Sequence, residues 1–84
     1  MEIQIHNAKK VTYDGSDYFL VCLCDDSGNL LFDRANRCYD EEATSGYSKY
    51  DDAVDYAKAL AKRRVVKRIY DKDEHRVLWS ATKK

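Results

Sequence analysis

The chain has 84 residues, of which 44% are hydrophobic and 36% are charged, and its 15 Lys and Arg balance its 15 Asp and Glu. This length and composition predict a single domain, residues 1–84, and exclude both a disordered chain and two independent cores. The net charge of +0 excludes the strong positive field of a basic nucleic-acid-binding protein, so only the distribution of charge along the chain can matter.

Apolar runs and cysteines indicate the compartment. The longest apolar run, Tyr18 to Cys24, is shorter than the roughly 20 residues that span a bilayer. No signal-peptide-like stretch lies near the N-terminus, and Cys22, Cys24 and Cys38 have spacings that suit neither a disulfide framework nor a zinc site. We therefore expect a cytoplasmic protein with free thiols, no membrane contact, no metal and no cofactor.

The first 17 residues predict a strand and a turn. Ile3 and Ile5 alternate with polar residues, which is typical of a strand with one wet face, and we expect this strand to resume at Val11 and Tyr13. The sequence "DGSD", residues 14–17, predicts a tight hairpin turn because glycine adopts positive φ freely.

Two more strands are expected before the helix. The run from Tyr18 to Cys24 is apolar on both faces, which predicts a strand in the interior of the sheet. Residues 30–39 begin apolar and become charged, which predicts a third strand that runs from the core toward an edge. We expect residues 40–46, "DEEATSG", to form a loop.

The clearest element is a helix that begins near residue 49. Ser48 followed by Asp51 resembles a capping box, and acidic residues in the first turn suit the helix dipole. The apolar residues of this segment recur at spacings of three and four, so they share one face: Tyr50, Ala53, Val54, Ala57, Leu60 and Ala61. Alanines on that face predict close packing of the helix on a sheet.

After the helix, the runs "VVKRIY" and "HRVLWS" predict two further strands. The predicted fold is α+β, with a single helix packed on one face of a four- to five-stranded antiparallel sheet in the order β-β-β-α-β-β. Strand alternation then puts Val66, Arg68 and Tyr70 on the helix-free face. We expect Val65 and Ile69 to face the helix, with Lys67 reaching past the helix edge.

Charge is segregated along the chain. Residues 14–55 carry eleven Asp or Glu and three Lys or Arg, whereas residues 56–84 carry ten Lys or Arg and three Asp or Glu. The basic half offers a nucleic-acid interface made of Lys62, Arg63, Arg64 and Arg68. The same cations at the helix end also suit the helix dipole, and the acidic half would repel phosphate.

No catalytic motif is present. The chain lacks a glycine-rich phosphate loop, a G-x-S-x-G elbow and an H-E-x-x-H helix. Asp40, Glu41 and Glu42 are consecutive in a loop, so we expect their side chains to diverge rather than to act as an acid–base pair. The sequence therefore predicts a protein that is not an enzyme.

The seven tyrosines and Trp79 exceed what a core of this size can bury, and such aromatics are enriched at protein interfaces. Tyr56 lies off the apolar helical face, where it serves either as an interface residue or as part of the helix flank. The predicted partner-binding residues are Tyr56, Val66, Arg68, Tyr70, Asp40, Glu41 and Glu42.

Residues 47–79, "YSKYDDAVDYAKALAKRRVVKRIYDKDEHRVLW", are similar to the helix-then-hairpin of small uncharacterised bacterial and phage domains. That resemblance implies a fold but no reaction. In size and architecture the chain also looks like some phage-encoded inhibitors of host defence. We expect a small non-enzymatic protein-binding module, such as an inhibitor or adaptor, that binds another protein or a second copy of itself, with a nucleic-acid-binding protein as the alternative.

Overall fold

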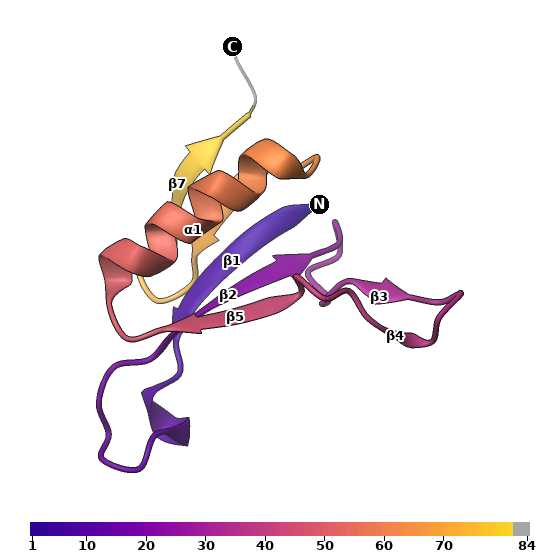
Figure 1. Ribbon diagram of the computed structural model, residues 1–84. Coiled ribbons are helices and arrows are strands. Elements are labelled where there is room, and N and C mark those ends of the chain that lie inside the picture. The colour runs from indigo at the N-terminus through magenta and orange to yellow at the C-terminus, as the bar shows by residue number, and fades with distance from the viewer. Residues whose placement is uncertain (82–84) are drawn as a thin grey trace.

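The computed structural model describes residues 1–81 as one helix on a five-stranded sheet, with a separate two-stranded sheet to one side (Figure 1). The elements in chain order are β1 (Glu2–Asn7), a 3₁₀ turn (Lys9–Val11), β2 (Phe19–Cys24), β3 (Phe32–Asp33), β4 (Cys38–Tyr39), β5 (Thr44–Tyr47), α1 (Tyr50–Arg63), β6 (Arg68–Asp71) and β7 (Arg76–Ser80). The α+β class and the single helix on one face of a five-stranded sheet are as predicted.

The large sheet has the order β5-β2-β1-β6-β7 and is mixed rather than purely antiparallel. Every neighbouring pair is antiparallel except β1 and β6, which run parallel. The prediction of a purely antiparallel sheet is wrong because α1 carries the chain back across the sheet after β5. A crossover helix of this kind returns the next strand in the same direction as the last one.

The third strand of the sheet is β5, in the segment that was expected to be a loop. Residues 30–39 instead leave the sheet after a single bridge between Cys24 and Leu30, and they fold back on themselves as β3 and β4. Sequence pattern missed β5 because its residues, "TSGY", show no apolar alternation. The interior position predicted for β2 is confirmed, since it lies between β5 and β1.

The connection between β1 and β2 is longer than the predicted tight hairpin. Pairing stops at Asn7 and Phe19, so the chain does not resume a strand at residues 11–13. The Asn7 carboxamide holds the ends of this loop together, because its oxygen accepts the backbone N–H of Lys9 and of Tyr18 and its nitrogen donates to Asp17. Gly15 does adopt positive φ, but inside a wide loop.

The core lies between α1 and the sheet. Ala53, Ala57 and Leu60 of α1 are fully buried, which confirms the predicted helical face. They pack on apolar residues of the three inner strands, which are Ile3, Ile5, Val21, Leu23 and Ile69. The predicted capping box is wrong, because the N-cap is Lys49 and no side chain of residues 1–81 caps the helix.

The prediction for Val65 and Val66 is reversed. Val65 is 86% exposed in the turn after α1, whereas Val66 is 5% exposed and belongs to the core. The alternation failed here because β6 begins at Arg68, so the two-residue period does not extend back to residue 66. Ile69 faces the helix as expected. Lys67 does not lie under the edge of the helix, because its side chain is exposed to solvent.

The sheet face opposite α1 carries Arg68 and Tyr70, as predicted. The Arg68 guanidinium stacks over the Tyr70 ring at 4.6 Å from its centroid, and its Nε donates to Glu2 at 2.7 Å. Within residues 1–81, no helix has the length and apolar composition needed to cross a bilayer.

Candidate functional site

The two-stranded sheet forms an arm, defined here as residues 32–39, that extends away from the body of the protein (Figure 1). Its strands pair Phe32 with Tyr39 and Asp33 with Cys38. Neither strand is hydrogen-bonded into the large sheet. All eight of its residues are exposed, so the arm is a surface feature rather than a part of the core.

A single carboxylate organises the tip of the arm. Asp33 accepts the backbone N–H of Ala35 at 2.9 Å and of Asn36 at 3.3 Å, and the Asn36 side chain donates to it at 2.6 Å. Arg37 then takes a left-handed conformation with φ of 56°, which closes the turn. The tip therefore presents Arg34 and Arg37 to solvent, without an ion pair to any residue in the described part of the chain.

Two aromatic rings cover one side of the arm. Phe32 and Tyr39 lie edge to face, with ring centroids 5.3 Å apart and planes at 80°. Phe32 is 48% exposed and Tyr39 is 60% exposed. Each ring therefore packs against the edge or face of the other while about half of its surface stays exposed, which is typical of aromatic residues at protein interfaces.

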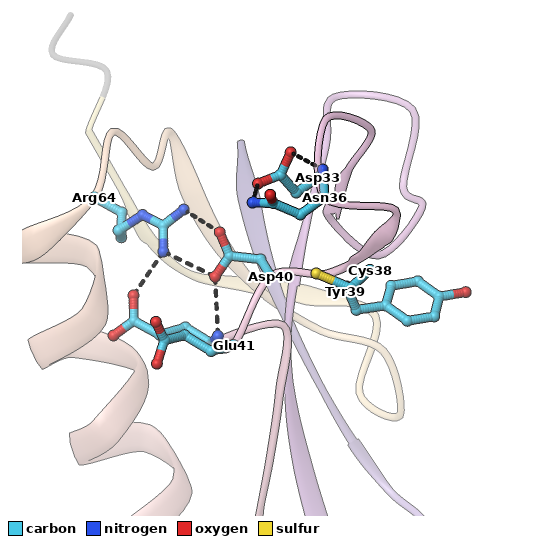
Figure 2. A pocket seen from close by; sticks show the side chains of 8 residues that line it. Asp33, Asn36, Cys38, Tyr39, Asp40, Glu41 and Arg64 are labelled. Atoms are coloured by element: carbon cyan, nitrogen blue, oxygen red, sulfur yellow. Dashed lines mark hydrogen bonds and ion pairs between the residues drawn. The ribbon is translucent and has the colours of Figure 1, made fainter.

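The base of the arm is fastened to the end of α1 by an ion-pair network (Figure 2). The guanidinium of Arg64 donates to both oxygens of Asp40, at 3.2 and 2.9 Å, and to Glu42 at 2.6 Å. Arg63 pairs with the other oxygen of Glu42. The expectation that these neighbouring carboxylates diverge is therefore wrong for Asp40 and Glu42, because one guanidinium gathers both; Glu41 alone is exposed and unpaired within residues 1–81.

These contacts set the charge states of the network. Hydrogen bonds from Arg64 hold the pKa of Asp40 below its ordinary value, and those from Arg63 and Arg64 do the same for Glu42. Reciprocally, the two carboxylates raise the pKa of Arg64. All of these groups stay ionised at neutral pH. The ion-pair network of Asp40, Glu42, Arg63 and Arg64, called the clamp below, therefore holds the base of the arm under physiological conditions.

An open cleft of about 710 Å³ lies between the arm and the end of α1. It is lined by Asp33, Asn36, Cys38, Tyr39, Asp40, Glu41, Glu42 and Arg64. Figure 2 shows the Arg64 guanidinium turned toward Asp40, with the Tyr39 ring pointing away from both. Carboxylates outnumber the single lining guanidinium, so the cleft is acidic while the tip of the arm is basic.

The predicted site residues are dispersed over the molecule. Tyr56 is half-buried, with its ring 5.5 Å from that of Tyr47 and the Arg63 guanidinium 5.8 Å above it, which favours the interpretation as helix flank. Val66 lies in the core and so cannot contribute to a surface. Arg68 and Tyr70 share the open sheet face, on a different side of the molecule from α1.

The predicted nucleic-acid residues are largely neutralised within the fold. Arg63 and Arg64 are paired with carboxylates at the base of the arm, and Arg68 is paired with Glu2. Lys62 alone of the four has no ion pair to another described residue. The run of cations in the sequence therefore does not form a free basic patch.

The three cysteines differ in how exposed their thiols are. Cys22 and Cys24 lie on β2, where burial raises the pKa of both thiols, that of Cys24 to about 11. Cys38 is exposed on the arm. Among residues 1–81, no three of His, Cys, Asp or Glu are placed to hold a metal ion together.

A second cleft, of about 500 Å³, lies at the other end of the sheet beside Tyr50 and Asp71. Asp71 is buried, and it accepts a hydrogen bond from the Tyr50 hydroxyl at 2.8 Å and from the backbone N–H of Asp73 and Glu74. Burial and this contact with Asp71 raise the pKa of Tyr50 to about 12. These three hydrogen bonds tie the carboxylate to the helix and to a turn, so we assign it a structural role.

Sequence reasoning missed the arm. Its signal is the segment "FDRANRCY", in which the side chain of Asp33 can accept the backbone N–H groups two and three residues later and so fold the chain back between two aromatic residues. No protein-family model, no curated protein and no solved structure matches this chain.

Proposed function

We propose that this chain is a small non-enzymatic protein-binding module, an inhibitor or adaptor acting in the cytoplasm, and that the arm is its contact surface. The observation that carries the proposal is the exposed edge-to-face pair of Phe32 and Tyr39 on a strand pair that is not hydrogen-bonded into the large sheet. Aromatic residues and arginine dominate the binding energy of protein interfaces, and Arg34 and Arg37 flank this pair.

The clamp at the base of the arm supports the same proposal. A two-stranded hairpin of this size is marginal by itself in water, so an unanchored arm would lose entropy on binding a partner. Arg64 joins the arm base to α1 through Asp40 and Glu42, which places the aromatic pair in a fixed orientation. In this proposal Asp40 and Glu42 act by positioning the arm, and Glu41 is left to contact a partner.

The helix-free sheet face is a second surface in the proposal. Arg68 and Tyr70 stack on each other there and are half-buried, so they offer less free area than the arm. We place them at the periphery of the binding surface and Tyr56 outside it.

Nucleic-acid binding is the alternative function. An aromatic pair beside two arginines suits the stacking of unpaired bases, which is what favours this alternative. Against it, the acidic cleft adjoins the arm, and three of the four predicted phosphate-binding cations already hold carboxylates. A phosphate backbone would therefore meet little net positive charge.

Affinity capture from the source cell with three forms of the protein tests the proposal. The wild type and a Val77→Ser control, which removes an exposed apolar side chain from β7, should retain the same protein partner. A Phe32→Ser, Tyr39→Ser double variant should lose it. Titration of each form with single-stranded DNA and RNA at two salt concentrations tests the alternative, since phosphate binding must weaken steeply with salt.

A further inference from the structure

The tip of the arm carries two guanidiniums that no carboxylate of the described part of the chain neutralises. Arg34 and Arg37 lie in the turn between β3 and β4, and both are exposed. Neither side chain has an ion pair to another described residue. In contrast, Arg63, Arg64 and Arg68 each pair with a carboxylate. The two cations at the tip are therefore available to an anion from outside the molecule.

Asp33 precedes Arg34 in the sequence but does not neutralise either arginine. Its oxygens accept the backbone N–H groups of Ala35 and Asn36 and the Asn36 carboxamide, and these bonds hold the turn closed. Arg37 takes its left-handed backbone conformation within the same turn. The two guanidiniums are therefore mounted on a turn that is hydrogen-bonded within itself, which lowers the backbone entropy that binding would cost.

The two guanidiniums and an aromatic ring share one hollow at the tip. This hollow has a volume of about 540 Å³ and is lined by Phe32, Arg34 and Arg37. Phe32 is half-exposed, so the hollow has an apolar wall beside its two cations. The larger cleft at the base of the arm is rich in carboxylates, whereas none of the three residues that line this hollow is acidic. Its charge and its lining therefore suit an anionic group that is attached to an apolar one.

We propose that this hollow binds an Asp or Glu side chain of the protein partner, in a segment that carries an apolar residue beside it. The carboxylate accepts hydrogen bonds from the guanidiniums of Arg34 and Arg37, and the apolar neighbour packs on the Phe32 ring. Guanidinium and carboxylate form strong charge-assisted pairs, and arginine and aromatic residues are enriched at protein interfaces. The inference rests on the proposed function, because it states what the arm recognises in its partner.

Charge selects an acidic protein segment over a nucleic acid as the occupant. A phosphate backbone carries a negative charge at every nucleotide, so its binding depends on many cations along its path. The tip offers two cations, and beyond them the path reaches the carboxylates of the cleft at the base of the arm. A single carboxylate on a protein needs no further cations.

Peptide titration of the unmodified protein, followed by NMR through the Nε–Hε signals of its arginines, tests the inference at the site itself. The probe is a synthetic Gly-Ser peptide that carries one Phe flanked by Glu, and the control peptide has Gln in place of Glu. The Glu peptide should shift the signals of Arg34 and Arg37, and added salt should weaken its binding. The signals of Arg63 and Arg64 should stay in place, because their guanidiniums already hold carboxylates. The Gln peptide should bind about 3-fold to 30-fold more weakly.

Charge exchange gives an independent measurement. Arg34→Gln combined with Arg37→Gln should bind the Glu peptide about 3-fold to 30-fold more weakly than the wild type does. Arg34→Glu combined with Arg37→Glu should lose the Glu peptide and bind instead a peptide with Lys in place of Glu. Lys58→Gln combined with Lys62→Gln removes the same charge from α1 and should bind like the wild type. All four positions are exposed, so these variants should keep the fold.

Equal binding of the Glu and Gln peptides would overturn the inference. So would signals of Arg34 and Arg37 that respond only to oligothymidylate, or only when the protein alone is concentrated, since nucleic acid or a second copy would then occupy the tip.

Affinity capture separates the inference from the proposed function. A protein partner that is lost by the Phe32→Ser, Tyr39→Ser variant and by the Arg34→Gln, Arg37→Gln variant is the expected result. A partner lost by the first variant but kept by the second would leave the arm as the contact surface and refute only the acidic segment. A partner kept by both would refute the arm as the contact surface, and the inference with it.

Discussion

The guanidinium of Arg64, just beyond the end of α1, donates to both carboxylate oxygens of Asp40, which lies 24 residues earlier at the base of the arm. This contact joins the arm to the body of the protein. Because the same guanidinium also binds Glu42, the chain on which the arm is mounted is held at two adjacent places.

Replacement of this guanidinium should loosen the arm and lower stability modestly. We expect Arg64→Ala to reduce the free energy of unfolding by about 1 kcal/mol, because the network is bidentate but partly exposed and therefore screened by solvent. Amide hydrogen exchange of residues 32–39 should accelerate more than that of β1 and β2. Lys62→Ala, which removes a cation that has no ion pair to another residue of 1–81, should change neither quantity.

Arg64→Ala should also change how the free energy of unfolding depends on pH. The folded-state pKa values of Asp40 and Glu42 lie below the ordinary values of 3.8 and 4.5, so their stabilising effect is complete above about pH 4.5 and is lost as pH falls through the folded pKa values. Urea unfolding from pH 7 to pH 2 should show a smaller decline for Arg64→Ala than for wild type. Parallel pH profiles would show that the clamp contributes nothing to folding.

Gly46 lies against the side chain of Tyr18, which leaves no room for a larger residue at this position. A Cβ at this position would overlap the side chain of Tyr18, which lies against the open face of β5. Gly46→Ala should therefore cost about 1 kcal/mol by displacing that ring, as overpacking does. In a Tyr18→Ala background the same substitution should cost much less. Additive effects in urea melts would mean that ring and glycine do not touch.

Ala57 tests the packing of α1 on the sheet. It is fully buried, so Ala57→Leu should overpack the core and cost about 1–3 kcal/mol. Ala59 is exposed on the other side of the helix, and Ala59→Leu should be nearly neutral. Thermal melts of the two variants compare them directly, and equal losses would place the helix in a different rotation.

The sequence predicted those parts of the fold that local patterns encode. The spacing of Ala53, Ala57 and Leu60 identified the buried face of α1, and Ile69 was assigned to the correct side of β6. The prediction for Val66 is wrong because the strand β6 begins only at Arg68, and sequence alternation assigns faces only within the strand. No local pattern links Asp40 to Arg64, so the clamp, and with it the orientation of the arm, emerges only from the tertiary structure.

The structural role given to Asp71 can be tested through its hydrogen bond with Tyr50. Tyr50→Phe removes one donor from Asp71 and should cost about 1–2 kcal/mol, since a charged acceptor in a buried position loses a hydrogen bond. Tyr39→Phe removes an exposed hydroxyl and should leave stability unchanged. A loss of equal size in the two variants, measured by urea unfolding, would contradict the structural role given to Asp71.

Photo-cross-linking in the source cell tests most directly whether the arm contacts a protein partner, as we propose. A benzophenone amino acid placed at Tyr39 should give a discrete protein adduct. The same group at Tyr13, which is fully exposed in the loop between β1 and β2, should give none above background. Identical adducts from both positions, or adducts at Tyr39 that contain only nucleic acid, would contradict the account.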